Sequence, residues 1–206
     1  MGGTFDPPHV GHLLAALDAC DHFELDRLVF VPAAQQPLKG DGHSAPANHR
    51  LGMVELMAKA DVRLGVDAIE VQRGGLSFTV DTLTEYERRF PESERFFLLG
   101  IDAFALLDQW REPARVVSLA HFVVMTRAGN GSTSGGVALE EPRLDDVTSK
   151  VRAIGGAAAA APHVMDLRRI DVSSTEIRDR VRSGRAIRGF VSDAVAQYIE
   201  FNGLYR

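Results

Sequence analysis

The 206-residue sequence has one cysteine, one tryptophan and no long apolar run. Cys20 has no second cysteine with which to form a disulfide bond or a thiolate metal cluster, so we expect a buried, reduced thiol. No apolar segment approaches the ~20 residues that a membrane-spanning helix needs, and no basic-then-apolar leader comes before the first motif. The sequence therefore predicts a cytoplasmic protein that has no membrane partner.

The sequence is also short of basic residues, with 23 lysines and arginines against 28 aspartates and glutamates and a net charge of −5. A surface of this charge does not attract nucleic acid as a whole. We expect no nucleic-acid partner, and any anionic substrate must be bound by local groups. The sequence leaves the oligomeric state open, and a homo-oligomer is compatible with it.

Segments with helical and strand-like patterns alternate along the chain. Apolar residues at helical spacing predict helices over 13–23, 47–60, 77–90, 102–110, 111–120, 144–154, 174–184 and 192–203. Short apolar runs predict strands over 27–33, 62–66, 68–73, 95–100, 121–126 and 163–172. This alternation is typical of an α/β protein with a parallel sheet covered on both faces. We expect a single domain over residues 1–206, in which 128–162 is a variable, partly flexible insertion that begins with the loop-like AGNGSTSGG.

The chemistry begins with the stretch GGTFDPPHVGH, residues 2–12. A glycine-rich turn that runs into a helix offers backbone N–H groups and the positive end of the helix dipole to an anion. His9 and His12 lie three residues apart and project from nearby positions, and Gly11 between them leaves space for a bulky group. Two imidazoles and a row of amides suit a phosphate that gains charge during a reaction. We expect Asp6 to be an acceptor that stabilises the turn.

Two other interpretations of the histidine pair stay open. Two histidines at this spacing can bind zinc, but no third ligand lies nearby in the sequence, so we predict no protein metal site. Either imidazole could instead be an ordinary polar side chain in a turn.

A second motif, DVSSTEIRDRVRSG, lies near the other end of the chain. Ser174 or Thr175 is a suitable N-cap for a helix that ends at Gly184. Alone, this would be a capped helix with solvated arginines. Together with the opening motif it predicts two phosphate-binding helix starts that share one cleft.

Both motifs resemble those of the nucleotidyltransferase superfamily, because GGTFDPPHVGH contains its HxGH signature and DVSSTEIR is similar to its ISSTxIR motif. The resemblance implies a Rossmann-like doubly wound parallel sheet. It also implies an ATP site made by Gly2, Gly3, Thr4, Phe5, His12, Ser174, Thr175 and Arg178. In this superfamily an apolar strand ends just before the glycines, whereas only Met1 occupies that place here. We therefore expect a truncated first strand and a native start upstream of Met1.

Two further stretches resemble bacterial nicotinate mononucleotide adenylyltransferase. RGGLSFTVDTL is similar to its RGGxSYTxDTL segment, in which Thr79 would contact the nicotinate carboxylate. GIDAFALLDQW is similar to its GxDxxxxxxxW block, in which Gly100 and Asp102 would contact ATP and a ribose, and Trp110 would stack on the nicotinate ring. Lys39 and Arg127 match positions near the phosphates. Without the resemblance, Thr79, Asp81 and Asp102 could simply cap helices, and Trp110 could belong to the core.

The resemblance implies attack by the 5′-phosphate of nicotinate mononucleotide on the α-phosphorus of ATP, giving deamido-NAD and pyrophosphate. His9, His12, Lys39 and Arg178 are the expected catalytic residues, and Mg²⁺ is expected to arrive with ATP. Three alternatives remain: phosphopantetheine adenylyltransferase or a cytidylyltransferase, a non-catalytic nucleotide-binding protein, and a fragment of a class I tRNA synthetase.

Overall fold

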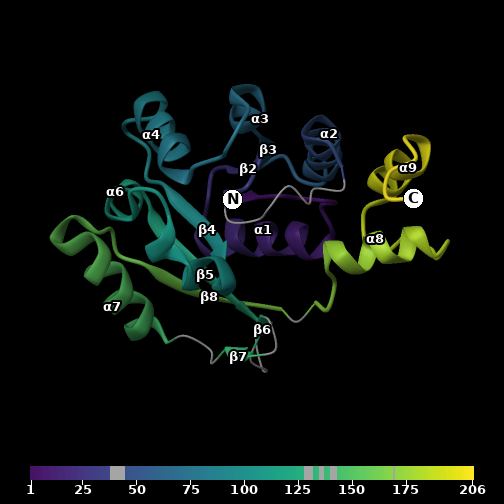
Figure 1. Cartoon of the computed structure of the whole chain (residues 1–206). Helices are drawn as coiled ribbons and strands as arrows, with labels where there is room; N and C mark the ends of the chain where they lie inside the picture. The colour runs from purple at the N-terminus through teal and green to yellow at the C-terminus, as the bar shows by residue number, and fades with distance from the viewer. Residues whose placement is uncertain (38–44, 128–131, 135–136, 140–142, 169) are drawn as a thin grey trace. The chain divides into compact units, whose positions relative to one another are not determined.

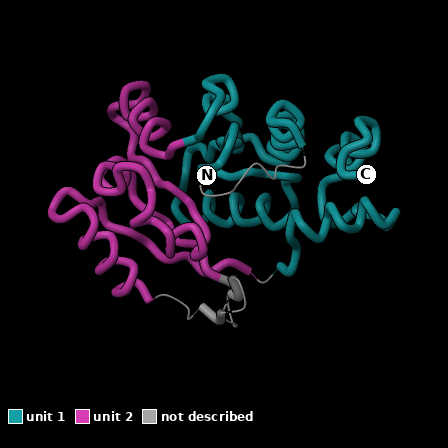
Figure 2. The backbone as a smooth tube through the Cα atoms, in the orientation of Figure 1, with its two compact units in different colours: residues 1–77, 170–206 teal, residues 78–169 magenta. Residues whose placement is uncertain are grey.

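A computed structural model of the protein describes residues 1–37, 45–127, 132–134, 137–139, 143–168 and 170–206. The chain forms two compact units, which Figure 2 shows in different colours. Unit 1 consists of Met1–Ser77 and Ile170–Arg206, and unit 2 consists of Phe78–Arg169. Each unit is described by itself below, and the single-domain expectation stays a prediction.

Unit 1 contains a parallel sheet of three strands in the order β1 (Gly2–Gly3), β2 (Leu28–Pro32) and β3 (Leu64–Val66). The apolar run of β2 is almost wholly buried because β2 lies between the other two strands. The helices of this unit, labelled in Figure 1, are α1 (Val10–His22), α2 (Ala47–Ala58), α3 (Ile69–Arg73), α8 (Ser174–Arg182) and α9 (Asp193–Phe201).

The first strand is short but paired. Gly2 lies opposite Val31, and the backbone N–H of Val31 donates to the carbonyl oxygen of Met1 at 3.0 Å. The expectation that native residues precede Met1 stays a prediction.

The strand predicted over 68–73 is wrong, because this segment forms the helix α3. Its alternation of apolar and polar residues covers only Ile69 to Val71, which is too short to separate a strand from a helix. The Asp67 carboxylate accepts the backbone N–H of Ile69 at 2.9 Å and so stabilises the helix start. Gly74, at φ 69°, ends the helix.

Unit 2 contains a second parallel sheet, in the order β4 (Phe96–Gly100), β5 (His121–Arg127) and β8 (His163–Leu167). Its helices are α4 (Thr79–Arg89), α5 (Ile101–Ala105), η1 (Leu107–Gln109), α6 (Pro113–Leu119), α7 (Leu144–Gly155) and η2 (Gly156–Ala158). The parallel α/β class is confirmed.

The segment expected to be a mobile loop is described in part. β6 (Ser132–Ser134) pairs with β7 (Val137–Leu139) in an antiparallel ladder. The rest of 128–136 lies outside the described residues.

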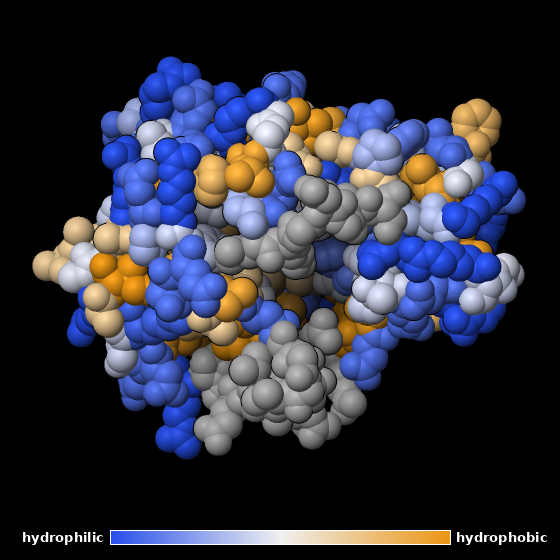
Figure 3. All heavy atoms as spheres, in the orientation of Figure 1, coloured by the Kyte–Doolittle hydropathy of each residue, from blue (hydrophilic) through white to orange (hydrophobic). Residues whose placement is uncertain are grey.

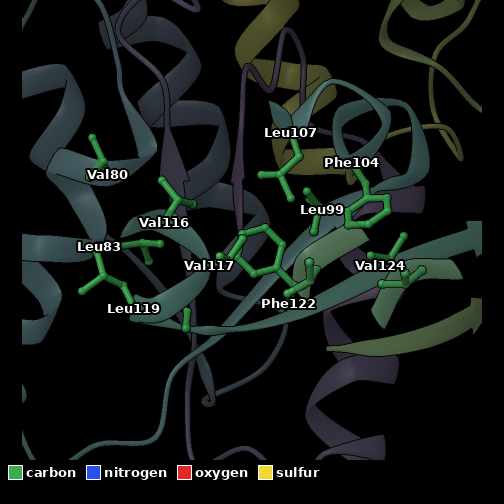
Figure 4. Packing of buried hydrophobic residues seen from close by; sticks show 13 residues of the cluster. Val80, Leu83, Leu99, Phe104, Leu107, Val116, Val117, Leu119, Phe122 and Val124 are labelled. Atoms are coloured by element: carbon green, nitrogen blue, oxygen red, sulfur yellow. The ribbon is translucent and has the colours of Figure 1, made fainter. Parts of the chain in front are cut away.

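The core of unit 2 joins one face of its sheet to helices α4 and α6, as Figure 4 shows. Leu99 and Phe122 from neighbouring strands pack with the helical residues Leu83, Val116 and Val117. Val116 and Val117 are fully buried. This packing holds β4, whose carboxyl end carries Gly100, beside the start of α5.

Candidate active site

The turn between β1 and α1, residues 4–9, is here called the phosphate loop. Phe5 lies in this loop with φ 53°, a conformation that is strained for a residue with a side chain. Its ring is 2% exposed and packs edge-on against Phe30 and His12. A Cβ at Gly3 would lie 2.9 Å from this ring, so Phe5 needs glycine at that position. Any contact of Phe5 with a ligand is therefore made by its backbone.

Asp6 is an internal acceptor, as the sequence predicted. Its carboxylate is buried and accepts hydrogen bonds from the backbone N–H of Ala45 at 3.2 Å and from the Tyr205 hydroxyl at 2.8 Å. Burial, and then the neighbouring Asp6, raise the pKa of Tyr205 far above its usual value. Tyr205 therefore stays a hydrogen-bond donor to the loop.

The two histidines stack on each other at the start of α1, with ring centroids 3.7 Å apart. The backbone N–H of His9 donates to Nδ1 of His12 at 3.2 Å. Because Nδ1 of His12 accepts this bond, its proton resides on Nε2. His12 therefore carries an N–H donor at the start of α1, where the Val10 and His12 amides already donate to the carbonyl oxygens of Phe190 and His9.

The space beside Gly11 is filled from within the protein. A Cβ at Gly11 would lie 3.0 Å from Nδ1 of His9. The expectation that Gly11 makes room for an external group is therefore wrong in its details, since the glycine allows the His9 ring to stack on His12.

The N-cap of the helix in the second motif lies one residue earlier than predicted. Ser173 is the N-cap of α8, and its hydroxyl accepts the backbone N–H of Glu176 at 3.1 Å. The prediction of Ser174 or Thr175 as the cap is wrong, because Ser173 has the extended backbone that an N-cap requires. The side chains of Ser174 and Thr175 are thus left for other contacts.

Those contacts join α8 to the phosphate loop. The bonded residues are 167 and 172 positions apart in the sequence. Ser174 Oγ donates to the carbonyl oxygen of Pro7 at 2.8 Å. Arg178 donates from Nη1 to the carbonyl oxygen of Asp6 at 2.7 Å and from Nη2 to Oγ1 of Thr175 at 3.1 Å. The structure thus brings together the two predicted helix starts within unit 1, and Figure 3 shows a mainly hydrophilic surface over α8.

Two buried polar atoms at this junction have no hydrogen-bond partner among the described residues. They are Oγ1 of Thr4 and Nε of Arg178. A buried donor without a partner costs about 1–3 kcal/mol, so such atoms in a loop of this composition point to a polar ligand.

Two predicted residues escape description. Lys39 lies outside the described residues, and of Arg127 only the backbone, the last residue of β5, is described.

The remaining predicted residues belong to unit 2. Thr79 is the first residue of α4, while Phe78 is its N-cap, and the Thr79 hydroxyl forms no hydrogen bond with any described residue. Asp102 is exposed in the first turn of α5, whose N-cap is Gly100. The simple capping roles are therefore absent, and both side chains are available to a ligand. No described atom lies within 4 Å of a Cβ built on Gly100.

Trp110 combines the two roles considered for it. Its ring meets Phe97 edge to face at 6.0 Å and packs on the unit 2 core, yet it stays partly exposed. A partly exposed aromatic ring can stack on a flat ligand.

Comparison with known proteins identifies the family of the chain. A family model described as cytidylyltransferase-like matches residues 1–180. A probable nicotinate-nucleotide adenylyltransferase from Gemmatimonas aurantiaca is 46% identical over 206 residues, all of this chain and 90% of that protein. Its namesake from Kineococcus radiotolerans is 37% identical over 205 residues, all of this chain and 89% of that protein. The chain belongs to the nicotinate-nucleotide adenylyltransferase family.

Solved structures of adenylyltransferases have the same fold as this chain. The Plasmodium falciparum nicotinic acid mononucleotide adenylyltransferase complexed with NaAD matches with a TM-score of 0.75 at 16% identity, over 99% of this chain and 94% of that one. The same protein complexed with APC matches with a TM-score of 0.71. The Rossmann-like class is confirmed, as is the family expected from RGGLSFTVDTL and GIDAFALLDQW. The protein is a nucleotidyltransferase of NAD biosynthesis.

Sequence reasoning missed Arg50, which has the largest fully buried side chain among the described residues of this adenylyltransferase. It shares the buried stripe of α2 with Met53, Val54 and Met57, at helical spacing. An arginine in an otherwise apolar stripe is the signal that could have identified it. Tyr205 was also missed, and no local pattern marks it.

Metal and membrane features were sought in the described part of the adenylyltransferase. There, no three histidine, cysteine or acidic side chains come together as a metal site. No helix in the same residues combines the length and the apolar character needed to cross a bilayer.

Proposed function

We propose that the protein transfers the adenylyl group of ATP to nicotinate mononucleotide, giving deamido-NAD and pyrophosphate, and that the phosphate loop with the starts of α1 and α8 binds ATP. The observation that carries this assignment is the pair of hydrogen bonds from Ser174 and Arg178 to the loop that bears His12. They place two helix N-termini, an imidazole N–H and a guanidinium around one loop, which is a donor set for a triphosphate.

In this mechanism the protein supplies donors and needs no general base. The second pKa of a phosphate monoester is about 6, so the attacking 5′-phosphate is already ionised at neutral pH. His12, with its proton on Nε2, stabilises charge on the α-phosphoryl oxygens, and His9 holds the imidazole in that orientation. Arg178, together with Lys39, stabilises charge on the departing pyrophosphate.

The roles proposed for unit 2 concern the mononucleotide. Trp110 stacks on the nicotinate ring, the Thr79 hydroxyl donates to its carboxylate, and Arg127 binds near its phosphate. Asp102 binds a ribose hydroxyl, beside the open space at Gly100. These assignments come from the motif matches, and the unengaged Thr79 and Asp102 side chains support them.

The Mg²⁺ that we propose to accompany ATP is part of that substrate. The described side chains at the loop are imidazole, hydroxyl and guanidinium groups, while the Asp6 carboxylate is already bound to Ala45 and Tyr205. This set suits phosphate oxygens better than a cation, and Mg²⁺ is commonly held by substrate phosphates and water.

The test is a pyrophosphate-release assay with ATP and either nicotinate or nicotinamide mononucleotide. We expect pyrophosphate release only when ATP and a mononucleotide are both present. The kcat/KM for nicotinate mononucleotide should be higher than that for nicotinamide mononucleotide. Turnover only with phosphopantetheine or with CTP would assign another reaction, and ATP binding without any turnover would make the protein a nucleotide sensor.

A further inference from the structure

The guanidinium of Arg50 joins three separate segments of unit 1 below the phosphate loop. Nη1 donates to the carbonyl oxygens of Thr4 and Ala33, both at 2.7 Å. Nη2 donates to Ala34 at 2.9 Å, and Nε donates to Ala45 at 3.2 Å. One side chain of α2 thus holds the phosphate loop, the end of β2 and the segment before α2 together.

Burying the charged guanidinium of Arg50 removes it from water and costs free energy. The residue is 1% exposed, and burial lowers its pKa, although Asp6 nearby opposes that shift. Its four hydrogen bonds with described residues all go to main-chain carbonyls. Well-packed apolar residues often replace buried charges without loss of stability, so packing alone does not explain an arginine here.

The bond to Thr4 has a consequence for the next amide. A trans peptide group is planar, and its C=O and N–H point in opposite directions. When Arg50 holds the Thr4 carbonyl, it therefore fixes the direction of the Phe5 N–H, which points away from the guanidinium. That N–H forms no hydrogen bond with any described residue, so it remains a donor.

Two carbonyls on the other side of the loop are also held by side-chain donors, although the peptides to Pro7 and Pro8 carry no N–H. Arg178 holds the carbonyl of Asp6, and Ser174 holds that of Pro7. Carbonyl oxygens that face a polyphosphate would repel it, whereas amides that face it attract it. Turning these carbonyls toward hydrogen-bond donors of the protein therefore reduces the repulsion that an anion would meet at the loop.

We propose that Arg50 is a positioning residue, which orients the Thr4–Phe5 peptide so that the Phe5 N–H donates to a phosphate of the nucleotide. This inference rests on the proposed use of the phosphate loop for ATP, and it adds a residue that does not touch the substrate. A planar fork with donors in fixed directions serves three segments at once, which a lysine cannot do.

The test observes the Thr4–Phe5 peptide by NMR, because Thr–Phe occurs only once in the sequence. Protein labelled with ¹³C-carbonyl threonine and ¹⁵N-phenylalanine gives one carbonyl-to-amide correlation, that of Thr4 and Phe5. We expect this signal to shift when α,β-methylene-ATP with Mg²⁺ is added to the wild type. In Arg50→Lys it should start from a different position and need more analogue to saturate.

Kinetics give the second measurement. Arg50→Lys should lower kcat by roughly 10- to 100-fold, because small misplacements of reacting groups can cost that much, while KM for the mononucleotide stays close to the wild-type value. Met53→Ala is the matched control, since it truncates a fully buried apolar side chain of the same helix. It should lower Tm without changing kcat well below Tm.

Three results would overturn the inference: a Thr4–Phe5 signal that ignores the analogue in the wild type, identical responses in wild type and Arg50→Lys, or equal loss of kcat in Arg50→Lys and Met53→Ala. The first is measured without any variant and so does not depend on whether Arg50→Lys folds. If the wild type binds the analogue in this way but turns over no mononucleotide, the proposed reaction fails while the role of Arg50 stands.

Discussion

The polar groups of the two units differ in how far they are engaged in hydrogen bonds. In unit 1 the loop carbonyls and side chains are tied by hydrogen bonds from Arg50, Ser174, Arg178 and Tyr205. In unit 2 the Thr79 hydroxyl has no partner among the described residues and Asp102 is exposed. A polyphosphate needs many donors in fixed directions, whereas a flat ring and one carboxylate need a surface and a few donors. Substitutions in unit 1 should therefore affect turnover and stability, and those in unit 2 should affect KM.

The largest effect is expected for His12→Ala, which should lower kcat by on the order of 10²–10³, because one preorganised donor to the reacting phosphoryl group is lost. Steady-state kinetics with saturating ATP measure it, and circular dichroism checks the fold. His22→Ala, an exposed histidine at the other end of α1, is the control and should leave kcat unchanged. A His12→Ala enzyme with wild-type kcat would make the imidazole structural.

Tyr205→Phe tests how strongly unit 1 is tied. The hydroxyl that donates to the buried Asp6 carboxylate is lost, and we expect the free energy of unfolding in urea to fall by about 1.5–3 kcal/mol, the range for hydrogen bonds to charged groups. Tyr198→Phe, which loses a part-buried bond to His49, should cost less. An equal decrease in the free energy of unfolding in both variants would show that the Tyr205–Asp6 bond stabilises the protein no more than the Tyr198–His49 bond.

Trp110→Ala tests whether unit 2 binds the mononucleotide. Base stacking on an aromatic residue contributes about 1–3 kcal/mol, so KM for nicotinate mononucleotide should rise about 5- to 150-fold. KM for ATP should change far less, and Trp110→Phe should retain most of the affinity. Similar increases in both KM values would assign Trp110 to the core that it contacts through Phe97.

The smallest effect is expected for Thr79→Val. Loss of one hydroxyl donor should lower the preference for nicotinate over nicotinamide mononucleotide by roughly 2- to 10-fold, the worth of one hydrogen bond. The ratio of the two kcat/KM values measures it, with Thr84→Val on the same helix as the control. An unchanged ratio would place recognition of the carboxylate elsewhere.

The sequence predicted most local features of both units, but the strand over 68–73, the N-cap of α8 and the role of Gly11 were predicted wrongly. Apolar runs located strands β2, β4 and β5, which have five to seven residues. The three-residue alternation in α3 was too short to show its period. At α8 the serines and threonine at 173–175 all suit an N-cap, and only backbone geometry selects Ser173.

What the sequence determined by itself is the order of most elements, the tight turn before α1 and the second helix start, because these depend on residues a few positions apart. Only the tertiary structure decided that Arg50 holds the Thr4 carbonyl and that Tyr205 donates to Asp6, 199 residues away. Buried polar groups must find partners wherever the packed chain provides them. No local pattern specifies which distant residue that will be.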